Sequence, residues 1–175
     1  MPKLTNILLI RHAEKPLDPL DPSLTAEGLA RAQAYVEYFQ RYVVDQAVIK
    51  LDYLFAAANS IGSNRSTLTL APLSMALGVP VDTRFDDRGF QQLADEILGN
   101  RKYDRSSILV CWHHGQILHL AYALGASPQS LPALWPADVF GWLLQLSFDA
   151  NGACVARVIN QQLMAGDDGV QSRTQ

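Results

Sequence analysis

Cysteine is scarce in this sequence, because Cys111 and Cys154 are the only two among its 175 residues. A disulfide framework, on which many small secreted domains depend, is therefore not expected. Both cysteines lie in apolar, strand-like runs. This placement favours reduced thiols in the core of a cytoplasmic protein.

An excess of positive charge is also missing. The chain has 14 Lys and Arg against 17 Asp and Glu, for a net charge of −3. A general nucleic-acid binder usually needs a basic face to release counterions from the phosphate backbone. We therefore expect no nucleic-acid partner, and any positive potential must be local.

Long hydrophobic runs are absent as well. No apolar stretch approaches the roughly 20 residues that span a bilayer. Residues 1–6 carry one basic residue, and the apolar run 7–10 leads into Arg11 without a small-residue cleavage site, unlike a signal peptide. The sequence thus predicts a cytoplasmic protein that does not bind membranes.

The size and pattern of the chain predict one domain, over residues 1–164, and a disordered tail over 165–175. Predicted strands alternate with helices, which is typical of parallel βαβ units. We therefore expect an α/β fold: a three-layer α/β/α sandwich with a mostly parallel central sheet and a C-terminal antiparallel hairpin. The strands are expected at 7–10, 51–58, 107–112, 139–148 and 153–159, and residues 81–85 form a short strand or an extended segment. The helices are expected at about 26–43, 64–77, 90–98 and 116–124.

Two of these helices carry detailed expectations. Thr25 is a good N-cap for the first helix. Pro72 lies inside the second helix, where it removes a hydrogen bond, so we expect a kink or a restart there. The apolar stripe of the first helix is predicted to contain Leu29, Ala32, Val36, Phe39 and Val43.

The chemistry is concentrated where predicted strands end. Arg11 and His12 follow the apolar run 7–10, and His113 and His114 follow the strand at 107–112. Arg65 lies in the first turn of a helix, where free N–H groups already favour an anion. Since the carboxyl ends of parallel strands meet at one edge of a sheet, these cations are expected to surround one anionic ligand.

These motifs resemble those of the histidine phosphatase superfamily, also called phosphoglycerate mutase-like, over about residues 5–160. Arg11-His12-Ala13 resembles its Arg-His-Gly signature, although Ala13 replaces the glycine. Leu24-Thr25-Ala26-Glu27-Gly28 through Ala32 matches its Leu-Thr-x-x-Gly-x-x-x-Ala segment. Arg65 with Thr69 and the run Trp112-His113-His114-Gly115 match its second Arg and second His.

The resemblance implies a two-step phosphoryl transfer without a metal or another cofactor. Neutral His12 would attack phosphorus and carry a phosphohistidine that water then hydrolyses. Arg11, Arg65 and the second imidazole would hold the phosphoryl oxygens. Glu14, Thr25 and His114 are expected to bind substrate.

Two assignments stay open at this point. His113 is favoured over His114 as the second catalytic histidine, because adjacent side chains leaving a strand point to opposite faces. Asp87 aligns best with the family's proton donor, but Asp86 or Glu14 could serve instead.

The sequence thus predicts a phosphatase acting on a phosphomonoester or a protein phosphohistidine, so its partner is a phosphorylated small molecule or phosphoprotein. Alternatives are a non-catalytic phosphate-binding module, a phosphoglycerate mutase-type phosphotransferase, and a zinc-dependent hydrolase that uses Cys111 with the nearby histidines. Substrate specificity is expected in the loops 16–23, 86–90 and 127–137. The pattern does not indicate an oligomeric state.

Overall fold

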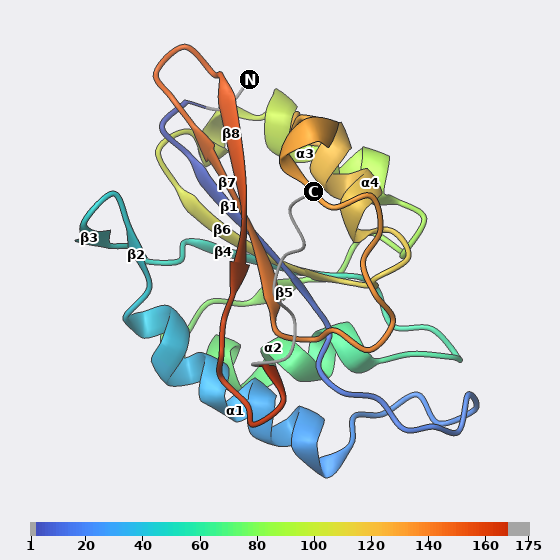
Figure 1. The fold of residues 1–175 in the computed structure, drawn as a ribbon. Coiled ribbons are helices and arrows are strands. Elements are labelled where there is room, and N and C mark those ends of the chain that lie inside the picture. Colours follow the sequence, from blue (N-terminus) through green and yellow to red (C-terminus); the bar gives the residue numbers. More distant parts are fainter. Residues whose placement is uncertain (1–2, 168–175) are drawn as a thin grey trace.

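The computed structural model describes residues 3–167, whose main feature is a six-stranded mixed sheet in the order β5-β4-β6-β1-β7-β8 (Figure 1). The four strands from β5 to β1 pair in parallel, whereas β7 pairs antiparallel with both β1 and β8. The strands are β1 (Asn6–Arg11), β4 (Tyr53–Ala56), β5 (Val81–Asp82), β6 (Ser107–Trp112), β7 (Trp142–Phe148) and β8 (Cys154–Asn160).

Helices cover both faces of this sheet, as Figure 1 shows. Leu8 and Ile10 of β1 pack on the side of α1 (Ala26–Gln40) and α2 (Arg65–Leu77). Ile7 and Leu9 pack on the side of α3 (Phe90–Gly99) and α4 (Ile117–Ala123). A strand buried on both faces reads as a continuous apolar run, which is why residues 7–10 show no alternation. The predicted three-layer α/β/α sandwich is confirmed.

Short elements complete the described part of the chain. A small hairpin of β2 (Val43–Val44) and β3 (Ala47–Val48) follows α1, and it was not predicted from the sequence. Two 3₁₀ turns, η1 (Arg101–Tyr103) and η2 (Pro128–Ser130), lie in connecting segments. None of the helices within residues 3–167 is long and apolar enough to cross a bilayer.

The first helix differs from its predicted form. Thr25 is its N-cap as expected, but the helix ends at Gln40 and Val43 belongs to β2. Leu29 is 54% exposed, so the predicted stripe is wrong in part. The buried face consists of Gly28, Arg31, Ala32, Tyr35 and Phe39. The buried face therefore differs from the predicted apolar stripe. It includes Arg31 and Tyr35, whose polar groups are hydrogen-bonded inside the protein.

Helix α2 continues through Pro72 as one element, so the predicted restart is wrong. Burial of Leu70 and Leu73 on either side of the proline offsets the local loss of a hydrogen bond. The helix ends at Leu77 and is capped by Gly78, whose φ of 66° is the left-handed conformation that glycine adopts readily.

Of the expected tail 165–175, residues 165–167 are described, and Asp167 among them is packed. Asp167 is buried and hydrogen-bonded to Arg31, so the packed chain extends past Met164, the boundary predicted from the sequence. Residues 168–175 lie outside the described residues.

Candidate active site

The site lies where β1, β4 and β6 end and β7 begins. His12 follows β1, His113 follows β6, and Arg65 is the first residue of α2, which follows β4. The loops that carry them emerge at the same edge of the sheet (Figure 1). The predicted convergence therefore holds for His12, His113 and Arg65 together with Arg11 at the last position of β1.

His12 is held in one tautomer. Its ring is 2% exposed, and its Nδ1 lies 2.8 Å from the carbonyl oxygen of Ala13. Because a carbonyl oxygen accepts and never donates, Nδ1 carries the proton and donates this bond. In the neutral ring the lone pair is then on Nε2, which is the atom required of a nucleophile.

A second imidazole lies against the first. The ring of His113 is 5.2 Å from that of His12, centroid to centroid, in a T-shaped arrangement. Burial, together with His113, Arg11 and Arg65, lowers the pKa of His12 to about 3, although the hydrogen bond to Ala13 opposes the shift. Burial likewise lowers the pKa of His113 to about 4, with help from Arg65 and Arg11. Both rings are therefore neutral at physiological pH.

This neutrality can be measured directly. In ¹⁵N-labelled protein we expect the His12 and His113 rings to stay neutral as the pH falls from 7 to 5, because protonation would place a charge in a buried, cationic site. The His12 signals should also show a single Nδ1–H tautomer. Titration of either ring near pH 6.5 would contradict the geometry described here.

Arg11 has no exposed surface, and a loop caps it. Its Nη1 donates to the carbonyl oxygens of Ala137 at 2.8 Å and Val139 at 2.9 Å, and more weakly to that of Pro136. The guanidinium lies 3.8 Å from the ring centre of Phe140. Its Nε and Nη2 are buried without a hydrogen-bond partner. Two unpaired donors in a fixed fork suit a phosphoryl group.

Arg65 is fixed by the loop that follows β1. Its Nε donates to the carbonyl oxygen of Ser23 at 3.1 Å, and its Nη2 donates to that of Asp21. The Thr69 hydroxyl donates to the Arg65 carbonyl oxygen at 2.8 Å and accepts from the Ala13 N–H at 2.9 Å. The helix start that carries Arg65 is thus tied to the loop that carries His12.

Ala13 fits the loop in which the family signature has glycine. Its side chain is fully buried, packed with Leu24 and Ala32. Its backbone is not among the positive-φ positions of the chain, so no glycine conformation is required. The methyl group adds packing at this position instead of strain.

Asp87, the predicted proton donor, lies in the loop between β5 and α3. Its Oδ1 is buried without a hydrogen-bond partner, and Trp112 Nε1 donates to its backbone carbonyl at 3.1 Å. Burial raises the pKa of Asp87, Asp86 raises it further, and Arg88 opposes the shift. Asp86 is exposed, and its Oδ1 accepts the Gly89 N–H at 2.7 Å, which commits it to a helix start.

The side chains of Glu14 and Thr25, which were predicted to bind substrate, are hydrogen-bonded to other residues of the protein. Both carboxylate oxygens of Glu14 accept hydrogen bonds from Arg31, at 2.6 to 3.1 Å. The Thr25 hydroxyl accepts the Gly28 N–H at 3.1 Å, and its backbone N–H donates to the Glu14 carbonyl. A Cβ on Gly28 would collide with the Glu14 backbone, so glycine lets α1 approach this loop closely.

His114 is half-buried beside the site. Burial lowers its pKa, and Arg11, Lys15 and His113 lower it further. The ring that contacts His12 is that of His113. The geometry therefore favours His113 in the second-histidine position, with His114 at the rim.

Cys111 lies apart from the histidines in the packing of the sheet. Its side chain belongs to the core on the α1 and α2 side, whereas the neighbouring Trp112 packs on the opposite face. Residues 3–167 contain no group of three or more His, Cys, Asp or Glu arranged to hold a metal ion.

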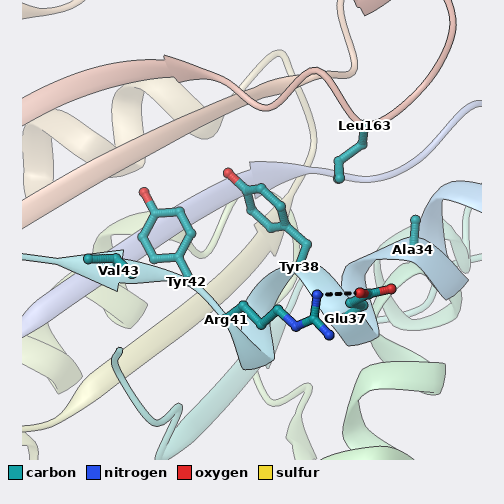
Figure 2. Close-up of a pocket in the computed structure, with 7 residues that line it drawn as sticks. All are labelled: Ala34, Glu37, Tyr38, Arg41, Tyr42, Val43 and Leu163. Atoms are coloured by element: carbon teal, nitrogen blue, oxygen red, sulfur yellow. Dashed lines mark ion pairs between the residues drawn. The ribbon is translucent and has the colours of Figure 1, made fainter. Parts of the chain in front are cut away.

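A separate groove of about 520 Å³ lies beside the end of α1 (Figure 2). Its wall includes Tyr38, Tyr42 and Leu163, with an ion pair of 2.7 Å between Arg41 and Glu37 at its edge. None of the predicted site residues lines it. It is therefore not the phosphate site.

Sequence reasoning missed Phe140, Arg31 and Asp167. Phe140 stacks on Arg11 from a loop without any motif, and it gives no signal in the sequence. Arg31 lies on the buried face of α1 with Gly28 and Tyr35. An arginine is not expected to be buried unless a carboxylate pairs with it, and the sequence does not show that Glu14 does so.

The sequence matches no protein-family model and none of the curated proteins. Solved structures do match, covering most of this chain. Protein histidine phosphatase SixA in complex with tungstate matches at a TM-score of 0.59 and 14% identity, over 89% of this chain and 97% of its own. Phosphoglycerate mutase from Plasmodium falciparum matches at 0.59 and 14% identity, over 95% and 97%.

A mycobacterial glucosyl-3-phosphoglycerate phosphatase in complex with inorganic phosphate also matches, at a TM-score of 0.54 and 17% identity, over 88% of this chain and 95% of its own. At such identities the likeness concerns the fold. The predicted phosphoglycerate mutase-like fold is thereby confirmed.

Proposed function

We propose that this protein is a metal-independent phosphatase that acts through a phosphohistidine on His12. The observation that carries the proposal is the His12 Nδ1–H bond to Ala13, which leaves Nε2 unprotonated in a ring that lies against the ring of His113 and feels the positive charge of Arg11. A neutral imidazole among fixed cations is suited to attack a phosphoryl group whose oxygens those cations bind.

In the first step, His12 Nε2 would form a bond to phosphorus in line with the leaving atom, an ester oxygen or an imidazole nitrogen, whose bond to phosphorus breaks. Burial raises the pKa of Asp87, and in its protonated form this residue would give its proton to the leaving atom. Arg11 Nε and Nη2, Arg65 and the neutral His113 would bind the phosphoryl oxygens as charge moves onto them.

In the second step, the Asp87 carboxylate would take a proton from water. The water oxygen would bond to phosphorus, and the bond from phosphorus to Nε2 would break. This step releases inorganic phosphate and restores neutral His12 and protonated Asp87, so the cycle closes without a metal.

The substrate is a phosphomonoester or a protein phosphohistidine, and one surface feature favours the protein. Loops around the site expose large apolar side chains: Leu17 and Leu20 after β1, Ile61 before α2, and Leu134 before β7. Exposed apolar side chains in the loops beside a cationic centre suit the surface of a phosphoprotein better than a small polar metabolite. SixA, a structural neighbour, is named as a protein histidine phosphatase.

The proposal is tested by hydrolysis of an aryl phosphate at pH 5 to 8 in the presence of a chelator. An aryl leaving group needs little help from an acid, so the assay depends mainly on His12 and the two arginines. We expect turnover that the chelator does not change. Loss of turnover with chelator would favour a zinc hydrolase, and phosphate binding without turnover would favour a non-catalytic binding module.

A further inference from the structure

Asp167, near the end of the described chain, lies behind the two loops that form the site. We infer that Asp167 is a positioning residue, which holds the His12 loop through Arg31 and Glu14 and the Arg11 loop through Gly141. The inference rests on the proposed function for its effect on rate, but its structural content can be tested without turnover.

The first connection is a buried chain of charges. Asp167 accepts from Arg31 Nη1 at 3.0 Å and from Nη2 at 2.8 Å. The same guanidinium donates to Glu14 from Nε at 2.8 Å and from Nη2 at 2.6 Å. Arg31 is 1% exposed, so it depends on both carboxylates to offset its desolvation. Glu14 is two residues from His12, and its position sets the path of that loop.

The second connection is steric. The Asp167 carboxylate occupies the place that a side chain at position 141 would fill, because a Cβ on Gly141 would lie 2.6 to 2.8 Å from its atoms. Gly141 directly follows Phe140, whose ring stacks on Arg11. Asp167 therefore backs the loop that also supplies three carbonyl oxygens to Arg11.

Hydrogen bonds to the segment after β8 fix the position of Asp167 itself. Its Oδ2 accepts the N–H groups of Leu163 at 3.0 Å and Met164 at 3.1 Å, and Asn160 Nδ2 donates to its carbonyl at 2.8 Å. Burial alone would raise the pKa of Asp167, but Arg31 and these N–H groups lower it overall. The carboxylate is thus charged at neutral pH and anchored to the end of β8.

Asp167→Asn tests the inference, because it keeps the shape and removes the charge that holds Arg31. Asp149→Asn is the matched control: Asp149 accepts the N–H groups of Asn151 at 2.7 Å and Ala153 at 2.9 Å in the β7–β8 turn. It too is a turn carboxylate, but the described residues give it no contact with the site. Both variants would be compared at equal folded concentration.

Two readouts separate positioning from stability. In ¹⁵N spectra, Asp167→Asn should mix the two tautomers of His12, because a loosened Glu14 loop weakens the Nδ1–H bond to Ala13, whereas Asp149→Asn should keep one tautomer. In aryl phosphate hydrolysis, Asp167→Asn should lower kcat by about tenfold or more, and Asp149→Asn should leave kcat within about twofold. Thermal melting would give the stability loss of each.

The tautomer readout does not depend on turnover, so it tests the inference even if the proposed function fails. A single His12 tautomer in folded Asp167→Asn, as in the control, would overturn the inference. If Asp167→Asn does not fold, Arg31→Lys keeps the charge but cannot bridge two carboxylates with a planar fork. It should mix the tautomers in the same way, and an unchanged His12 signal there would also overturn the inference.

Discussion

Replacing His12 with alanine is expected to abolish aryl phosphate turnover, with a loss in kcat of roughly a thousandfold or more, because it removes the proposed nucleophile. The remaining cations would still bind the phosphoryl group, so phosphate affinity should fall much less than kcat. Steady-state kinetics and phosphate binding by calorimetry measure the two effects separately.

His119→Ala is the matched control for this experiment. His119 is exposed on α4 and stacks on Phe90 at 5.7 Å between ring centroids, outside the group formed by His12, His113 and Arg11. It should retain the turnover of the unaltered protein. If the His12 variant keeps turnover within about tenfold of that protein, the chemistry does not pass through His12.

Asp87→Asn is expected to affect substrates according to their leaving groups. An alkyl phosphate needs a proton on its departing oxygen, so we expect a loss in kcat of about 10²- to 10⁴-fold, the range typical of a removed general acid. An aryl phosphate leaves without much protonation and should lose less than about tenfold. The ratio of the two losses is the diagnostic quantity, since a merely misfolded variant would lose both equally.

The pH dependence gives the same residue a second test. Asp87 must be protonated in the first step, so alkyl phosphate turnover should fall as the pH rises through its raised pKa. This fall should be absent in Asp87→Asn. If Asp86→Asn instead shows the larger loss in kcat on the alkyl phosphate, Asp86 is the proton donor and Asp87 is not.

Local patterns predicted most of what positions the site. The run 7–10 is a central strand because nothing polar interrupts it, and Arg11 and His12 follow at its carboxyl end. Thr25 caps α1 because a hydroxyl at that position satisfies a free N–H group. These features depend on residues that are neighbours in the chain, so they can be predicted from the sequence.

The remaining features depend on contacts between distant parts of the chain. Arg31 reads as a surface residue until Glu14 and Asp167 are brought to it, 17 residues before it and 136 after it. Phe140 and the carbonyl groups that bind Arg11 belong to a loop before β7. The composition of this segment predicts a loop but does not predict its contacts with Arg11. Glu14 and Thr25 were predicted to bind substrate because they belong to the family motifs. In the structure, Glu14 is hydrogen-bonded to Arg31, and Thr25 is hydrogen-bonded to the Glu14 backbone.

The most direct test of the central claim is to trap the covalent intermediate. The protein is mixed with a phosphoryl donor, quenched in alkali, where a phosphohistidine survives, and mapped by mass spectrometry. The mechanism predicts one phosphoryl group, labile to acid, on the His12 imidazole and absent from His12→Ala. A phosphoryl group on any other residue, or turnover of the donor without any phosphorylated protein under rapid quenching, would contradict it.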